Sequence, residues 1–186
     1  MKGVKERVSM KKIQKPKEGE YAPYTIMYIG LLPDDGLVLQ HLLNNLKATK
    51  ELVLSLPKES LTSRSAHDEW TIKEILVHII DDERIYVYRA LRFARNDTTE
   101  LPGFDQDVYT TCSEANERSI ENILDEFTAV RMATIAFFEK LEAKAFTRSG
   151  VSDGKCMSVR AAVYHIAGHE LHHFNSMRKK TSVPER

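Results

Sequence analysis

The chain has 186 residues, of which 42% are hydrophobic and 29% are charged, so it is long and apolar enough to bury one continuous core without disulfides. Its 27 basic and 27 acidic residues cancel, which gives no electrostatic footprint for a polyanion, and we expect neither nucleic acid nor a membrane as a partner. Two cysteines, with no apolar run long enough for a signal peptide or a membrane span, exclude a disulfide-rich secreted scaffold and predict a cytoplasmic protein.

The first segment, residues 1–30, mixes Lys, Pro and Gly with tyrosines and shows no helical period. We predict that it is an extended N-terminal arm wrapped around the body of the protein. We assign residues 31–186 to a single helical domain. Its first helix is predicted between Pro33 and Pro57, because leucine and valine recur there at three- and four-residue steps.

The second helix has a well-marked start. Thr71 and Glu74 have the spacing of a capping box, in which each side chain bonds to the backbone N–H of the other residue. Apolar residues then recur at helical spacing until about Asn96. The next segment, residues 97–116, contains proline and glycine without any period, which predicts a long connection able to span a bundle.

Two further helices are predicted after this connection. The third covers about residues 117–142, where isoleucine, leucine and phenylalanine repeat helically. Ser158 is the expected N-cap of the last helix, which should end near Lys179. No segment alternates as a strand should. We therefore predict an all-α protein in which four amphipathic helices bury their apolar stripes in a four-helix bundle.

The last helix carries an unusual concentration of histidine. His165, His169 and His173 are spaced four apart, so their imidazoles lie on one helix face, where two of them can hold one ion. His78, beside the apolar stripe of the second helix, is the best candidate for a third ligand. We predict a divalent metal ion, zinc or nickel, bound by His78, His169 and His173, with His165 as a neighbouring pocket residue. Three protein ligands leave a position for water or substrate, which is typical of a catalytic site.

Two acidic residues one turn after His78 are candidates for supporting this site. Asp81 or Asp82 could hold an imidazole N–H and fix the ring orientation. The alternative is that no metal binds: His78 would then be a hydrogen-bonded core histidine, and His169 and His173 would belong to a solvated polar face.

The residues from His169 to His173 also satisfy H-E-x-x-H, the zinc-protease pattern in which Glu170 would be the general base. Those proteases take a third ligand further along the chain. The candidates among the residues after His173 are Glu185 and the C-terminus, which are weak ligands for this purpose. We therefore give this pattern little weight.

The chain resembles the DinB/YfiT-like superfamily over about residues 34–180. Three stretches carry the resemblance: Trp70–Glu83, Leu101–Asp105 and Val159–His173. The resemblance implies a bundle with an up-down-down-up course, in which the long connection joins two parallel helices. It also implies His78, His169 and His173 as the metal ligands, and association into a homodimer, which is common among members.

Characterised members of this superfamily include metal-dependent thiol S-transferases and isomerases, so the resemblance implies a small-molecule substrate or a low-molecular-weight thiol. Our leading expectation is a thiol S-transferase, in which the ion lowers the pKa of a small thiol and presents the thiolate to an electrophile. We expect Trp70, Tyr86, Tyr164 and Arg160 to line or flank the pocket, with Arg160 attracting a substrate carboxylate.

Two other functions remain open at this stage. In a metal-dependent hydrolase, Glu170 or Asp82 would be the candidate catalytic base. In a non-catalytic metal-binding stress protein, the ion would simply brace the bundle, and its removal would lower the melting temperature markedly.

Overall fold

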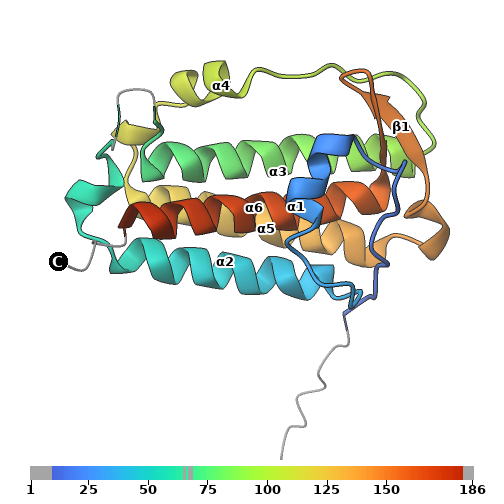
Figure 1. Ribbon diagram of the computed structural model, residues 1–186, viewed down its shortest axis with the longest axis horizontal. Helices are drawn as coiled ribbons and strands as arrows, with labels where there is room; N and C mark the ends of the chain where they lie inside the picture. The colour runs from blue at the N-terminus through green and yellow to red at the C-terminus, as the bar shows by residue number, and fades with distance from the viewer. Residues whose placement is uncertain (1–9, 65, 67–68, 182–186) are drawn as a thin grey trace, which may run out of the picture.

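The structure, a computed structural model, describes residues 10–64, 66 and 69–181. Four long helices account for most of this part of the chain: α2 (Val38–Ser55), α3 (Ile72–Ala94), α5 (Ile120–Lys140) and α6 (Val159–Thr181). Short 3-10 turns follow two of them: η2 (Lys58–Leu61) and η4 (Ala143–Ala145). In Figure 1, α2 and α6 run in one direction, and α3 and α5 run in the other. The predicted four-helix bundle with its up-down-down-up course is therefore confirmed.

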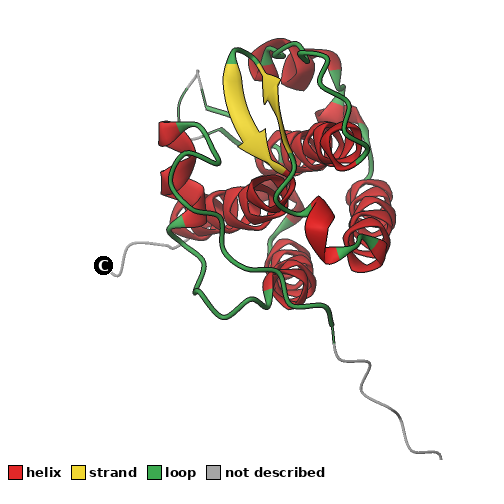
Figure 2. Cartoon of the chain, turned by 90° about the vertical axis from the view of Figure 1, so that its right-hand side faces the viewer, coloured by secondary structure: helices red, strands yellow, loops and turns green. Residues whose placement is uncertain are grey.

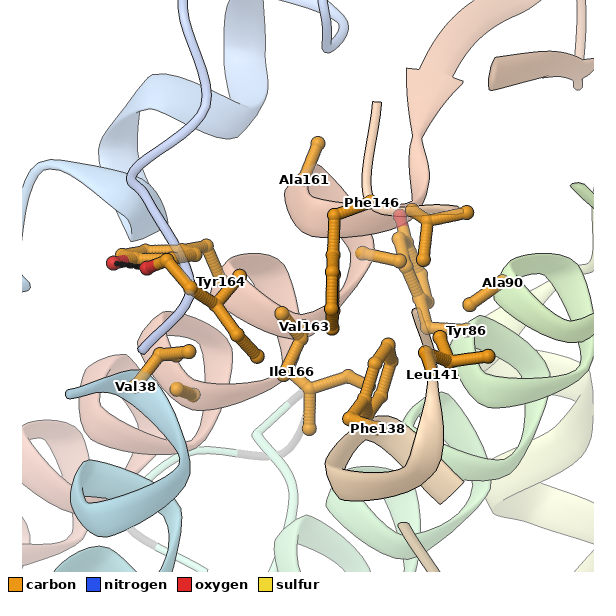
Figure 3. Close-up of a cluster of buried hydrophobic side chains, with 14 of the residues drawn as sticks. Val38, Tyr86, Ala90, Phe138, Leu141, Phe146, Ala161, Val163, Tyr164 and Ile166 are labelled. Atoms are coloured by element: carbon orange, nitrogen blue, oxygen red, sulfur yellow. Dashed lines mark hydrogen bonds between the residues drawn. The ribbon is translucent and has the colours of Figure 1, made fainter. Parts of the chain in front are cut away.

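The four helices enclose one core. α3 contacts α5 and α6, and α2 contacts the same two helices, so the bundle closes on itself when viewed along its axis (Figure 2). Buried apolar side chains form two clusters along this axis, and Figure 3 shows one of them, in which Phe138 of α5 lies beside Ile166 of α6. Full burial of one such side chain contributes about 1.5–3 kcal/mol, so these stripes drive bundle formation.

The predicted helix starts are confirmed at two positions. The hydroxyl of Thr71 accepts a hydrogen bond from the backbone N–H of Glu74 at 3.1 Å, and the Glu74 carboxylate accepts one from the Thr71 N–H at 2.7 Å. The capping box is thus complete. The Ser158 hydroxyl likewise accepts a bond from the N–H of Ala161 at 3.1 Å and caps α6. None of the described helices is both long and apolar enough to cross a membrane.

The prediction of no strand was wrong. Strands β1 (Ser149–Ser152) and β2 (Lys155–Ser158) form an antiparallel hairpin before α6. Its two-residue turn has positive φ at Asp153 (+53°) and Gly154 (+68°), as a type I′ turn requires, and Asp-Gly is a favoured pair for that turn. Strands of four residues are too short for alternation to be recognised, so the turn residues were the usable signal.

The connection between α3 and α5 is also more regular than predicted. It contains α4 (Gln106–Cys112), which is capped by the side chain of Asp105, and the 3-10 turn η3 (Ala115–Glu117). Leu101 ties this connection to the hairpin, because its N–H donates to the carbonyl of Val151 at 3.0 Å. The connection therefore passes the hairpin soon after α3 ends, and then runs back along α3 to α4 (Figure 1).

Residues 1–9 of the predicted arm lie outside the described residues. The rest is extended only in part, because it contains the 3-10 turn η1 (Pro23–Thr25) and the short helix α1 (Ile26–Ile29). α1 packs against the middle of α6, in front of it in Figure 1. Gly168 allows this close approach, since a Cβ atom there would lie 2.3 Å from the carbonyl oxygen of Tyr28. The arm thus crosses α6 at the turn that carries the central histidine.

Candidate metal centre

Three imidazoles from two helices meet between α3 and α6. His78 comes from α3, and His169 and His173 come from successive turns of α6. The Nε2 atom of His169 lies 3.0 Å from Nε2 of His78 and 3.1 Å from Nε2 of His173. His78 and His169 are buried, while His173 is partly exposed. The structure thus brings together the three residues that the sequence analysis proposed as ligands.

This donor set fits a divalent ion better than it fits a hydrogen-bonded cluster. A neutral imidazole nitrogen carries either one proton or one lone pair, so Nε2 of His169 can form one hydrogen bond and not two. Two ligand atoms that are each about 2.1 Å from one ion are about 3.0–3.4 Å apart, at angles between octahedral and tetrahedral. The separations of 3.0 and 3.1 Å from His169 fall in this range, so one ion could satisfy all three nitrogens.

The three imidazoles are neutral at physiological pH. Burial lowers the pKa of His78, holds the pKa of His169 well below its usual value, and lowers the pKa of His173 to about 3, because removing the imidazolium from water is costly. The negative charge of Asp82 opposes these shifts without cancelling them. The lone pairs that a metal requires are therefore available without prior loss of a proton.

Asp82 orients two of the histidines. Its Oδ2 atom lies 3.3 Å from Nδ1 of His169 and 3.2 Å from Nε2 of His165. Burial raises the pKa of Asp82, but its electrostatic interactions with His169 and His165 and the hydrogen bond from His165 outweigh burial, so the net pKa is lowered and Asp82 is a carboxylate. A carboxylate that accepts from Nδ1–H directs Nε2 of His169 toward the other two nitrogens. Asp82, His165 and His169 also lie close enough together to hold an ion. We interpret this second group as support for the three-histidine centre.

We expect Asp82→Asn to weaken zinc binding by about 10- to 100-fold, since loss of a carboxylate that holds a ligating imidazole typically has this effect. The zinc Kd, measured by competition with a chromophoric chelator, tests this. The adjacent variant Asp81→Asn is a matched control. Asp81 was the other candidate for holding an imidazole N–H. Its carboxylate lies 3.5 Å from the guanidinium of Arg84 and not at the histidines. Equal zinc Kd values for the two variants would contradict the role given to Asp82.

Three of the predicted pocket residues do lie at this centre. The Trp70 ring is 4.7 Å from the His78 ring, centroid to centroid. The Tyr86 ring stacks on His165 at 3.6 Å, with the two planes 4° apart. These aromatic faces give the centre apolar walls on the side of α3.

Two other predicted pocket residues point elsewhere. The guanidinium of Arg160 bonds to the carboxylate of Glu20, with its Nε 2.6 Å from the nearer oxygen. The hydroxyl of Tyr164 donates to the carbonyl of Ile13 at 2.9 Å. Both partners belong to the N-terminal arm, whose position on the bundle could not be predicted from the sequence.

Glu170 is also absent from the histidine centre. One of its oxygens accepts from the Thr49 hydroxyl at 2.9 Å, and the other lies 2.7 Å from the guanidinium of Arg131. Arg131 also bonds to Glu83 at 2.8 Å, and the side chains of both glutamates and the arginine are 0% exposed. Both Glu170 oxygens are therefore engaged inside the bundle. The residue does not fill the base position of the zinc-protease pattern.

Sequence analysis missed Tyr28 altogether. Its ring meets the rings of His165 and His169 edge to face, at centroid distances of 5.1 and 5.2 Å. No periodic pattern surrounds this residue in the arm, and its contact depends on packing between segments more than a hundred residues apart. A signal for it did not exist in the local sequence.

Comparisons with known proteins bear on this site and fold. A curated protein of Oceanobacillus iheyensis, named as a putative metal-dependent hydrolase, is 28% identical over 126 residues, covering 66% of this chain and 71% of that protein. YfiT from Bacillus subtilis, described as a probable metal-dependent hydrolase with an unusual four-helix bundle topology, is 15% identical; its structure matches with a TM-score of 0.70 over 80% of this chain and 86% of that one. The sequence pattern of the DinB superfamily matches residues 41–177, which include the three clustered histidines, and the chain therefore belongs to that superfamily.

Proposed function

We propose that this protein is a metal-dependent hydrolase that acts on an ester or amide bond of a small molecule. The observation that carries the proposal is the convergence of the Nε2 atoms of His78, His169 and His173, within 4.8 Å of one another. Two similar proteins, one named as a putative and the other as a probable metal-dependent hydrolase, support it. A divalent ion, zinc or nickel, would supply a Lewis acid for the substrate carbonyl and would lower the pKa of water.

Within this proposal His165 is the proton acceptor. Its Nε2 bonds to the Asp82 carboxylate at 3.2 Å, so the ring proton occupies Nε2 and Nδ1 keeps its lone pair. Nδ1 is buried and has no hydrogen-bond partner among the described residues, although His165 lines a cavity next to the centre. An oriented imidazole with a free nitrogen can remove a proton from a water molecule in that cavity. His165 thus replaces Glu170 as the candidate base.

The test begins with metal-free protein loaded separately with zinc and with nickel. We expect hydrolysis of p-nitrophenyl acetate or p-nitroacetanilide that depends on the ion. His165→Gln should lower kcat by about 100-fold, the usual contribution of a general base, while the zinc Kd stays near that of the wild type. Absence of hydrolysis with both ions and both substrates would sink the proposal.

The same preparations separate the competing functions. Turnover of chlorodinitrobenzene with bacillithiol, mycothiol, glutathione or cysteine, without hydrolysis, would assign the centre to thiol S-transfer. A marked fall in melting temperature on chelation, with no turnover of either kind, would indicate an ion that braces the bundle.

A further inference from the structure

A cavity of about 190 Å³ adjoins the metal centre on the side of His169. It lies where the arm, the hairpin and the connection after α3 come together, and its lining includes His169 and His165 together with Tyr86, Tyr28 and Phe104. A cavity of 150 Å³ can hold a benzene molecule, so this volume suits one ring or a short chain, and not a peptide. Its aromatic walls favour an apolar body.

One buried arginine in this cavity forms no ion pair with the described residues. Three arginines of the described residues are buried: Arg89, Arg131 and Arg160. Arg131 is paired with glutamates of α3 and α6, and Arg160 is paired with a glutamate of the arm. Arg89 is 7% exposed, yet no carboxylate of the described residues forms an ion pair with it. A buried charge without an opposite partner is costly, which indicates a binding role for Arg89.

The contacts of Arg89 hold its guanidinium in place and use one of its N–H donors. One N–H donates to the carbonyl of Pro102 at 3.2 Å. The guanidinium carbon lies 4.9 Å from the centre of the Tyr86 ring and 5.9 Å from that of Phe104. Because His165 already covers one face of Tyr86, Arg89 must cover the other. The remaining N–H groups are left for a carboxylate, which a guanidinium binds with two parallel hydrogen bonds.

Other groups in the cavity agree with a polar ligand at this end. The hydroxyl of Ser152, a residue only 6% exposed, is buried without a hydrogen-bond partner among the described residues. Two carboxylates also line the cavity, and each bonds to another residue: Asp82 to His165, and Asp153 to Lys155 at 2.9 Å. Lys155 lowers the pKa of Asp153 most and the charge of Arg89 helps to lower it, but the side chains of Asp153 and Arg89 form no ion pair. Among the described residues, Arg89 therefore keeps N–H groups that no carboxylate accepts, and Ser152 keeps a hydroxyl without a hydrogen-bond partner.

We infer that this cavity binds a small substrate that carries a free carboxylate on an apolar or single-ring body, and that Arg89 recognises the carboxylate. The inference rests on the proposed hydrolase function, since it takes the cavity beside His169 as the substrate side of the metal centre. Arg89 thereby takes the role that the sequence analysis gave to Arg160.

The test uses benzoate and its neutral analogue benzamide as probes, on full-length protein stripped of metal so that no ion can bind the carboxylate. We expect the wild type to bind benzoate about tenfold more tightly than benzamide, because hydrogen bonds to a charged group are worth more than neutral ones. Arg89→Met should lose this preference and still bind benzamide. Arg95→Met, which removes the same charge from an exposed position just after α3, should keep it.

If Arg89→Met does not fold, the wild type alone can test whether Arg89 binds the carboxylate. The Nε–H nuclear magnetic resonance signal of Arg89 should shift on addition of benzoate and not on addition of benzamide. Equal binding of the two probes by the wild type, or a preference retained by Arg89→Met, would overturn the inference. A preference for benzoate without any hydrolysis would support carboxylate binding in the cavity and contradict the proposed hydrolase function. Hydrolysis of neutral esters without a preference for benzoate would support the hydrolase function and contradict carboxylate binding.

Discussion

Replacing His169 by alanine should abolish tight zinc binding. Its Nε2 atom is the one that approaches both other nitrogens, and its Nδ1 is the one held by Asp82. Structural zinc sites with four protein ligands have an apparent binding free energy of about 10–16 kcal/mol, or about 2.5–4 kcal/mol per ligand. Losing one of the three histidines here should therefore raise the Kd by about two to three orders of magnitude. Competition with a chromophoric chelator measures this change directly.

His172→Ala is the matched control, since it removes an imidazole from the same helix that is not part of the convergent set. The His172 ring meets the rings of Tyr28 and His173 edge to face, at 5.4 and 5.3 Å, but its nitrogens are not among the converging ligand atoms. Its zinc Kd should equal that of the wild type. The thermal melting of both metal-free variants shows whether they are folded. Tight zinc binding by folded His169→Ala protein would mean that the ion, if any, is held elsewhere.

The second large effect is expected from Arg131→Met, which should lower the free energy of unfolding by about 3–5 kcal/mol. Arg131 is completely buried between Glu83 of α3 and Glu170 of α6, and it also donates to the carbonyl of Leu42 in α2 at 2.6 Å. Burial raises the pKa of Glu170 more than Arg131 lowers it. Without the guanidinium, the two glutamates would be buried with no positive charge between them. Urea unfolding measures the loss.

Two comparisons separate this effect from the loss of any ion pair. Arg84→Met breaks a pair with Glu126 in which the arginine side chain is 48% exposed, and it should cost less than about 1 kcal/mol. Adding Glu83→Gln and Glu170→Gln to Arg131→Met should recover part of the stability, because amides carry no charge to desolvate. A single Arg131→Met variant as stable as Arg84→Met would refute the argument.

The bundle and the histidine cluster could be predicted because both depend on local spacing. Apolar steps of three and four identify helices, and Thr71 with Glu74 marks a helix start within one turn. His169 and His173 share a helix face by their spacing alone. His78 was predicted as the third ligand from its place beside the apolar stripe of the second helix, and the superfamily resemblance implied the same residue.

Contacts between distant segments could not be predicted in the same way. Arg89 of α3 and Arg160 of α6 are both buried arginines that the sequence does not distinguish. The arm distinguishes them, because its Glu20 forms an ion pair with Arg160. Arg131 interrupts an apolar stripe and has no visible partner in the local sequence; its glutamates come from two other helices. The hairpin was missed because four-residue strands carry no recognisable alternation.

The position of the arm has a consequence for how such a protein can diversify. Residues 41–177, which match the superfamily pattern, contain every candidate ligand, whereas Tyr28 and part of the cavity wall precede that range. Exchange of this leading segment would therefore change part of the cavity wall and leave all three candidate ligands in place. Replacing the N-terminal arm with that of another superfamily member is therefore a direct way to change substrate selectivity while keeping the same histidines.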